Sequence, residues 1–202
     1  MTQRDQLLAA AERLFADQGV DATSLRAVMA AAGTNVAAVN YHFGSKDALL
    51  AEVIRHRSGT LRAEREERLV ALEDADPPDV HALAETIVGP VAALARRGDD
   101  AWIRLVNSIA ATRREPGWTL LNETFAPQAD RLAAVLLRIH PNLRRTTLRF
   151  RMAEATSMAF RVVGDLDFVR RNVGSAARPA SVDAVVADLT EAVAAILGGS
   201  GG

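Results

Sequence analysis

The chain has 202 residues, 49% of them hydrophobic and 24% charged, a composition typical of a globular protein with enough apolar surface to build a core. It contains no cysteine, which excludes disulfide bonds, cysteine-ligated metal sites and a thiol nucleophile. The net charge of −1 gives the whole chain no basic character, so any binding to nucleic acid must depend on a local arrangement of residues.

The first two predicted helices are short and sharply bounded. Apolar residues recur at helical spacing over Leu7–Phe15, and Gly19 is placed to end that helix. Thr23 or Ser24 then caps a second helix, which Gly33 interrupts with a tight turn.

A third and a fourth helix follow directly. Asn35 caps a two-turn helix over residues 36–42, and Ser45 caps a longer one that starts at Lys46 and runs to about residue 75. Two short helices joined by a tight turn are the arrangement of a helix-turn-helix, in which the later helix is the recognition element. Such a helix can enter the major groove with its N-terminus first, where its free N–H groups face phosphates and base edges.

The rest of the chain also has a helical pattern. A loop rich in Gly, Arg and Pro is expected between residues 164 and 179, and Pro127 is expected to bend or split the helix that contains it. The predicted fold is therefore all-α, with a helix-turn-helix domain over residues 1–47, a larger helical bundle over 48–197 that ends in two dimerisation helices, and a disordered tail over 198–202. The later helices are predicted over residues 79–97, 100–114, 118–139, 146–163 and 181–197.

A family resemblance rests on one stretch of the sequence. Leu14-Phe15, Gly19, Thr23-Ser24 and the run YHFGSK at residues 41–46 occur together at matching spacing. The stretch from Ala10 to Val53 thereby resembles the DNA-binding domain of the TetR family of transcriptional regulators, over about a quarter of the chain. The resemblance implies a ligand-responsive repressor that binds a double-stranded DNA operator, rather than an enzyme.

The resemblance also implies residue roles. Arg26 and Lys46 would contact phosphates, and Asn40 could read adenine. Residues 1–47 hold four basic and five acidic side chains, so few direct base contacts are expected, with DNA shape contributing to specificity. The predicted DNA-binding residues are Arg26, Asn35, Val36, Ala37, Ala38, Asn40, Tyr41, His42 and Lys46.

The C-terminal helices suggest two uses. The last two long helices carry apolar stripes that could form a four-helix bundle between two subunits, so that a homodimer would bind a palindromic operator. The resemblance further implies a pocket for a small-molecule inducer. The predicted interface residues are Met152, Ala155, Ala159, Val182, Val186, Leu189 and Val193, and the predicted pocket residues are Trp102, Asn107, Trp118, Phe125, Thr156 and Phe160.

Several alternatives stay open. The apolar stripes and the pocket residues could instead fill the core of a single chain. The chain could be a helical interaction or scaffold module that does not bind DNA, or a small helical enzyme, although it lacks a phosphate loop, a metal motif and a nucleophile elbow. The charged run over 62–68 predicts a solvated helix face with pairs along the helix. No cofactor or metal site is predicted, and without a signal peptide or membrane span a cytoplasmic protein is expected.

Overall fold

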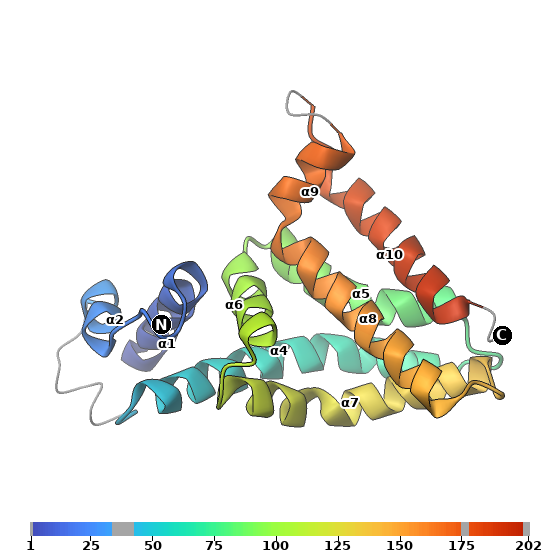
Figure 1. Ribbon diagram of the computed structural model, residues 1–202, viewed down its shortest axis with the longest axis horizontal. Helices are drawn as coiled ribbons and strands as arrows, with labels where there is room; N and C mark the ends of the chain where they lie inside the picture. Colours follow the sequence, from blue (N-terminus) through green and yellow to red (C-terminus); the bar gives the residue numbers. More distant parts are fainter. Residues whose placement is uncertain (1, 34–42, 175–177, 200–202) are drawn as a thin grey trace. The chain divides into compact units, whose positions relative to one another are not determined.

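The computed structural model describes residues 2–33, 43–174 and 178–199, and every regular element in these ranges is an α-helix (Figure 1). The predicted third helix, over residues 36–42, lies outside them. No helix in the described ranges is long and apolar enough to cross a membrane. The all-helical prediction is confirmed. The helices are α1 (Gln3–Gln18), α2 (Leu25–Ala31), α4 (Lys46–Asp74), α5 (Val80–Arg96), α6 (Asp100–Thr112), α7 (Gly117–Ile139), α8 (Arg145–Gly164), α9 (Leu166–Val173) and α10 (Val182–Gly198).

Helix ends lie where the capping residues predicted them. Gly19 ends α1 with a φ of 84°, and its N–H donates to the carbonyl of Phe15. The Ser24 hydroxyl accepts a hydrogen bond from the N–H of Ala27, so Ser24, and not Thr23, caps α2. The side chains of Ser45, Asp79 and Ser181 accept equivalent bonds at the starts of α4, α5 and α10.

The predicted loop between residues 164 and 179 is wrong over half its length, because α9 forms there. No α9 side chain is buried, and although its apolar residues Leu166, Val169 and Val173 recur at helical spacing, the Gly, Arg and Pro residues around them indicated a loop. It is held instead by Arg170, whose Nε donates to the carbonyl of Ala180 at 2.6 Å. Two smaller differences concern Pro127, which lies inside an unbroken α7, and Gly198, which is the last residue of α10 although disorder was expected from residue 198.

Contacts divide the chain into two units, which are described separately. The first contains Met1–Thr60 and Ala101–Phe125, and the second contains Leu61–Asp100 and Ala126–Gly202, so α4 and α7 contribute to both. The core of the first unit is mainly apolar, and it also buries Glu12, Thr23 and Ser58. It is built from Leu7, Leu8, Ala11 and Phe15 of α1, Val28 of α2, Leu49, Leu50, Val53 and Ile54 of α4, and Trp102, Ile103, Leu105 and Ile109 of α6.

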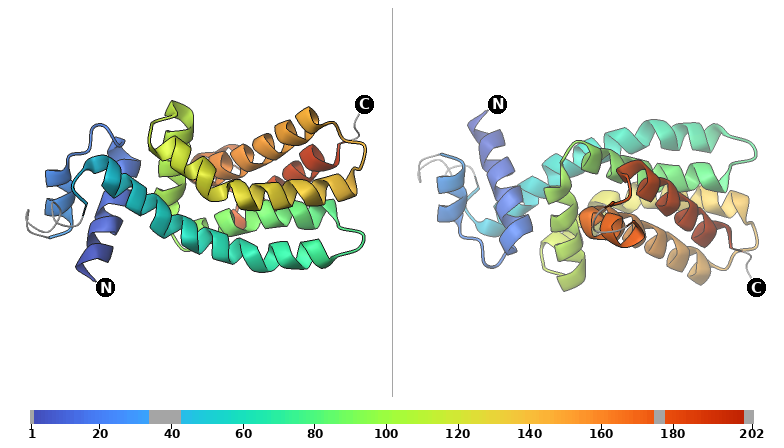
Figure 2. Two further views of the ribbon diagram at one scale, coloured as in Figure 1. Left: turned by 90° about the horizontal axis from the view of Figure 1, so that it is seen from below. Right: turned by 90° about the horizontal axis from the view of Figure 1, so that it is seen from above.

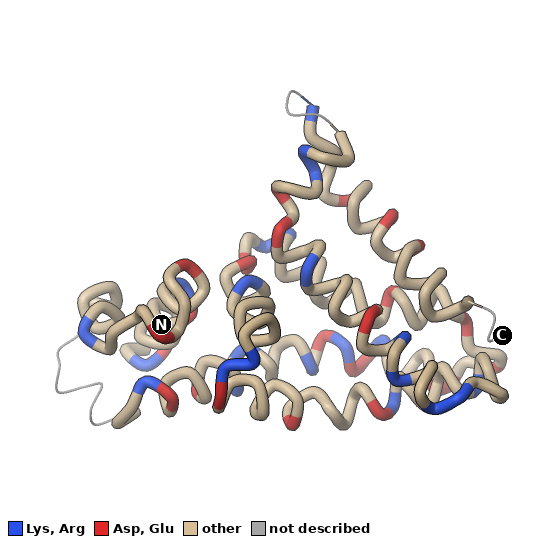
Figure 3. Tube along the Cα trace, viewed as in Figure 1, with Lys and Arg blue, Asp and Glu red and all other residues tan. Residues whose placement is uncertain are grey.

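In the second unit α5, α8 and α10 pack against one another, and the second half of α4 runs alongside α7 (Figures 1 and 2). Charged residues of both signs follow the α4–α7 seam (Figure 3). Arg131 of α7 makes a two-pronged contact with Glu73 of α4 at 2.6 and 2.8 Å and reaches Glu66 at 2.6 Å. These bonds lower the pKa of both carboxyl groups.

Candidate nucleic-acid interface

The connection between α1 and α2 is organised around a buried threonine. Thr23 is 1% exposed, and its hydroxyl lies 2.8 Å from the carbonyl oxygen of Gly19 and 3.1 Å from that of Leu14. A hydroxyl has one hydrogen to donate, so the two carbonyls share it. This contact holds the start of α2 against the end of α1 and thereby sets the position of the helix-turn-helix elements that the structure describes.

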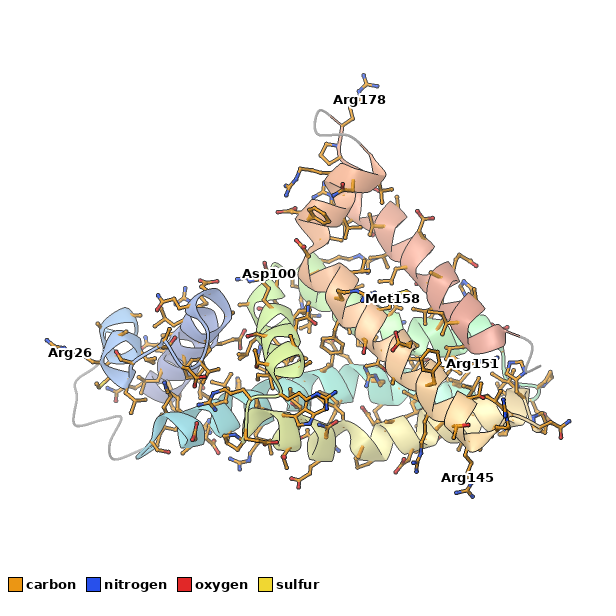
Figure 4. All side chains as sticks on the ribbon, viewed as in Figure 1. Arg26, Asp100, Arg145, Arg151, Met158 and Arg178 are labelled. Atoms are coloured by element: carbon orange, nitrogen blue, oxygen red, sulfur yellow. The ribbon has the colours of Figure 1, made fainter. Side chains whose placement is uncertain are left out.

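Only two of the predicted DNA-binding residues lie in the described ranges. Arg26 is exposed on α2 and points away from α1 (Figure 4). Lys46 is half-buried at the start of α4, and its Nζ donates to the carbonyl oxygen of Asp21 at 2.8 Å. An ammonium group has three N–H donors, so this bond leaves others for a phosphate. Those outside the described ranges are Asn35, Val36, Ala37, Ala38, Asn40, Tyr41 and His42.

A bridge that the sequence did not reveal connects three segments of the first unit. Arg114, between α6 and α7, places Nε 2.9 Å from Asp21 and Nη2 2.9 Å from Asp47. Burial disfavours the charged guanidinium, but the bonds to the two carboxylates outweigh it and raise the pKa of Arg114. The α1–α2 connection, the first turn of α4 and the α6–α7 connection are therefore held together by one side chain.

Helix α1 is fixed to its neighbours by further ion pairs within the same unit. Arg57 of α4 lies 2.8 Å from Glu12, and both side chains are largely buried. Arg4 pairs with Glu52 of α4, and Arg104 of α6 lies 2.8 Å from Asp17. Pairs over such sequence separations leave no local pattern, which is why sequence reasoning missed them.

The residues predicted for a ligand pocket are spread over both units. Trp102 is fully buried in the first unit and Phe160 is buried in the second, in keeping with the core role that the sequence left open for them. Trp118 is half-buried, with the guanidinium of Arg113 lying 5.7 Å from its ring centroid. The other predicted pocket residues, all half-buried, are Asn107 and Phe125 in the first unit and Thr156 in the second.

The residues predicted for a dimer interface divide into two groups. Ala155, Ala159, Leu189 and Val193 are buried inside the protomer, where α8 and α10 pack with α5, which is the alternative that the sequence left open for them. An interface through α8 and α10 must therefore use other faces of these helices. Met152, Val182 and Val186 stay half-buried.

Comparison with known proteins places this architecture in a family. Residues 7–53 match "Bacterial regulatory proteins, tetR family", and residues 85–195 match "Tetracyclin repressor-like, C-terminal domain". No match was found among curated proteins.

Solved structures share the fold. The TetR family transcriptional regulator PfmR from Thermus thermophilus is 20% identical over 100% of this chain and 99% of its own, with a TM-score of 0.70. The fatty acid degradation regulator FadR from Bacillus halodurans is 16% identical over 98% and 96%, with a TM-score of 0.70. AibR, solved with isovaleryl coenzyme A and operator DNA, is 16% identical over 95% and 97%, with a TM-score of 0.69. Because the C-terminal match alone spans more than half of the chain and the N-terminal match covers the helix-turn-helix, the protein belongs to the TetR family and is a DNA-binding transcriptional regulator.

Proposed function

We propose that this regulator is a ligand-responsive repressor that binds a palindromic operator as a homodimer and releases it when a small molecule binds. The observation that carries the proposal is α4, one unbroken helix of 29 residues that belongs to both units. The solved complex of AibR with isovaleryl coenzyme A and operator DNA supports both kinds of partner. The proposed domains remain residues 1–47 for DNA binding and 48–197 for ligand binding and dimerisation, and the role is not enzymatic.

Helix α4 is suited to transmit a ligand signal because both of its ends are anchored by side chains. At its start Lys46 bonds to the α1–α2 connection and Asp47 pairs with Arg114. Along its second half Glu66 and Glu73 pair with Arg131 of α7. A ligand that binds better to one position of the second half of α4 would shift the population of positions at its start, which lies next to the predicted recognition helix.

The outward faces of α8 and α10 support a dimer. Phe150 on α8 is 64% exposed, which is unusual for a large apolar side chain that has no partner to cover it. The exposed positions of α8 include Arg149 and Arg161, while those of α10 include Asp188 and Glu191. In a two-fold pair α8 of one protomer can face α10 of its partner, which brings opposite charges together. A two-fold protein then reads half-sites about 34–36 Å apart, or a multiple of that spacing.

The test starts from duplexes that the purified protein selects from a random pool. A palindromic consensus and a dimer mass by light scattering are expected. Lys46→Ala should weaken binding to all selected duplexes to a similar extent and reduce the salt dependence by about one phosphate contact per subunit. Arg145→Ala, which removes an exposed arginine at the start of α8, is the matched control and should leave binding unchanged. A consensus without two-fold symmetry, or a monomer bound to DNA, would contradict the proposal.

A further inference from the structure

An arginine lies in the apolar stripe of α4. Leu61, Leu69 and Leu72 are buried on one face of the helix, and Arg65 occupies the same face, one turn from each of the nearer two leucines. Arg65 is only 5% exposed. The prediction that residues 62–68 form a solvated face is therefore wrong at this position.

The contacts of the neighbouring residues show where Arg65 points. Glu64 bonds to Arg97 beside α5, while Glu66 bonds to α7, so these two side chains leave α4 in different directions. Arg68 lies against Gly89 of α5, which confirms the first direction. At 3.6 residues per turn, Arg65 projects between the two directions, into the interior that α5 and α7 flank.

Arg65 has no counter-charge among the residues that the structure describes. Within the described part of the chain its Nε has no acceptor, and no carboxylate pairs with the guanidinium. Glu64 pairs with Arg97. Glu66 accepts hydrogen bonds from Arg131 and Gln128. Glu67 is exposed on the opposite face of α4. Burial lowers the pKa of Arg65 to about 10, so the side chain still carries its charge at neutral pH.

A second buried arginine, Arg151, has a partner that compensates the cost of burying its charge. Arg151 of α8 is 9% exposed, and its Nη1 donates to the carbonyl of Leu197 at the C-terminal end of α10, where the helix dipole is negative (Figure 4). Over the described ranges of the chain, Arg65 has no such partner. A buried charge without a partner is expensive, and a ligand of opposite charge would remove that cost.

A second unsatisfied polar atom lies on the helix that faces this part of α4. Gln128 of α7 is buried, and its Nε2 donates at 3.0 Å both to the carbonyl of Arg62 and to Glu66, the residues on either side of Arg65 along the α4 turn. Its Oε1 is buried and has no donor in the described ranges. Within the described residues a buried donor and a buried acceptor thus remain unused on adjoining helices, beside the buried leucines of α4.

We propose that Arg65 receives the carboxylate of the effector, which is an amphiphilic organic monoanion with an apolar body. This inference rests on the proposed ligand-responsive function and names its ligand class. The flat guanidinium fork matches a carboxylate with two parallel hydrogen bonds. One buried positive charge balances one negative charge, which favours a carboxylate over a doubly charged phosphate. The surrounding leucines favour an aliphatic or aromatic body.

The test uses straight-chain carboxylates from hexanoate to dodecanoate, each compared with the primary amide of the same length, in titration calorimetry on the full chain. At least one carboxylate should bind the wild type, and its amide should bind at least about tenfold more weakly. Arg65→Met should lose at least as much affinity for the carboxylate. Arg62→Met, which removes an exposed arginine from the same helix, should bind like the wild type. Binding of no carboxylate, or equal binding by the amide or by Arg65→Met, would overturn the proposal.

A second measurement separates a ligand role from a structural one. Without ligand, Arg65→Met should raise Tm by about 2–4 °C, because it replaces an unpaired buried charge with an apolar side chain of similar length. A lower Tm would show that the folded protein already provides partners for the guanidinium of Arg65, and would overturn the proposal. Operator binding in the same preparations keeps the two proposals apart. If the protein binds its operator but no carboxylate, only the proposed ligand class is wrong. If it binds a carboxylate but no operator, the proposed function is wrong.

Discussion

Nη2 of Arg114 lies 2.9 Å from Oδ1 of Asp47, which connects the segment between α6 and α7 to the first turn of α4. The two residues are 67 positions apart in the sequence. The same guanidinium reaches Asp21 in the α1–α2 connection. The α6–α7 segment is therefore part of the scaffold that positions the DNA-binding elements, although it lies well beyond the predicted domain boundary at residue 47.

The first prediction concerns this bridge. In a double-mutant cycle with Arg114→Met and Asp47→Asn, urea unfolding should give a coupling of about 0.5–1 kcal/mol, a modest value because Asp47 is largely exposed. Each single variant should also weaken operator binding, since the start of α4 loses its tie to the α6–α7 segment. Fully additive single changes in unfolding free energy would show that the pair contributes nothing.

The second prediction distinguishes the two adjacent hydroxyl residues at the start of α2. Ser24→Ala should lower the free energy of unfolding by about 1 kcal/mol, because it removes the N-cap bond to Ala27. Thr23→Val should cost about 1 kcal/mol, because it removes the buried hydroxyl that donates to the carbonyls of Gly19 and Leu14. Urea denaturation measures both. Ser157→Ala, at an exposed position in α8, serves as the control and should change stability by no more than about 0.5 kcal/mol.

The third prediction compares two glycines. Gly59 lies inside α4 with open space where a Cβ would be, so Gly59→Ala should raise the free energy of unfolding by about 0.5–1 kcal/mol. Gly19 has a φ of 84°, so Gly19→Ala should lower it by about 1 kcal/mol or more. Thermal unfolding of the two variants shows directly whether each substitution raises or lowers Tm. If both substitutions moved Tm in the same direction, the backbone argument would fail.

The fourth prediction is a dependence of stability on pH. Hydrogen bonds from Arg131 lower the pKa of Glu66 and Glu73 in the folded protein. A carboxyl group with a lowered folded pKa stabilises the protein above its unfolded pKa of about 4.3, and this contribution is lost as the pH falls through the folded pKa. The wild type should therefore be more stable than Arg131→Met at pH 7, and the difference should shrink below about pH 4. Urea midpoints at pH 7 and pH 3 test this, and an equal difference at both would contradict it.

Features that depend on a few neighbouring residues could be predicted from the sequence. Gly19, Ser24 and Ser181 end or begin helices through bonds within one turn, so their residue types are sufficient signals. Helix α9 was missed although Leu166, Val169 and Val173 recur at helical spacing, because it is short and the Gly, Arg and Pro residues around it indicated a loop.

The long-range contacts and the burial of Arg65 in α4 could not be predicted from the sequence either. Arg114 finds its partners across 67 and 93 positions, and nothing in its own neighbourhood marks it. Arg65 stands in a run of alternating charges that is typical of a solvated face, and only its spacing from Leu61 and Leu69 indicates the interior. Of the candidate DNA-binding residues, only Arg26 and Lys46 could be placed, so the base-contacting set stays a prediction.

Lys46 is the only lysine of the chain, and its Nζ is bonded to the carbonyl of Asp21. Reagents that acylate side-chain amines therefore have a single target, and it lies where α4 meets the α1–α2 connection. Opening of this junction would free the amine from its carbonyl, so a change in its acylation rate reports a change at the junction. The natural sequence thus carries a site-specific reporter of the junction without any engineered label.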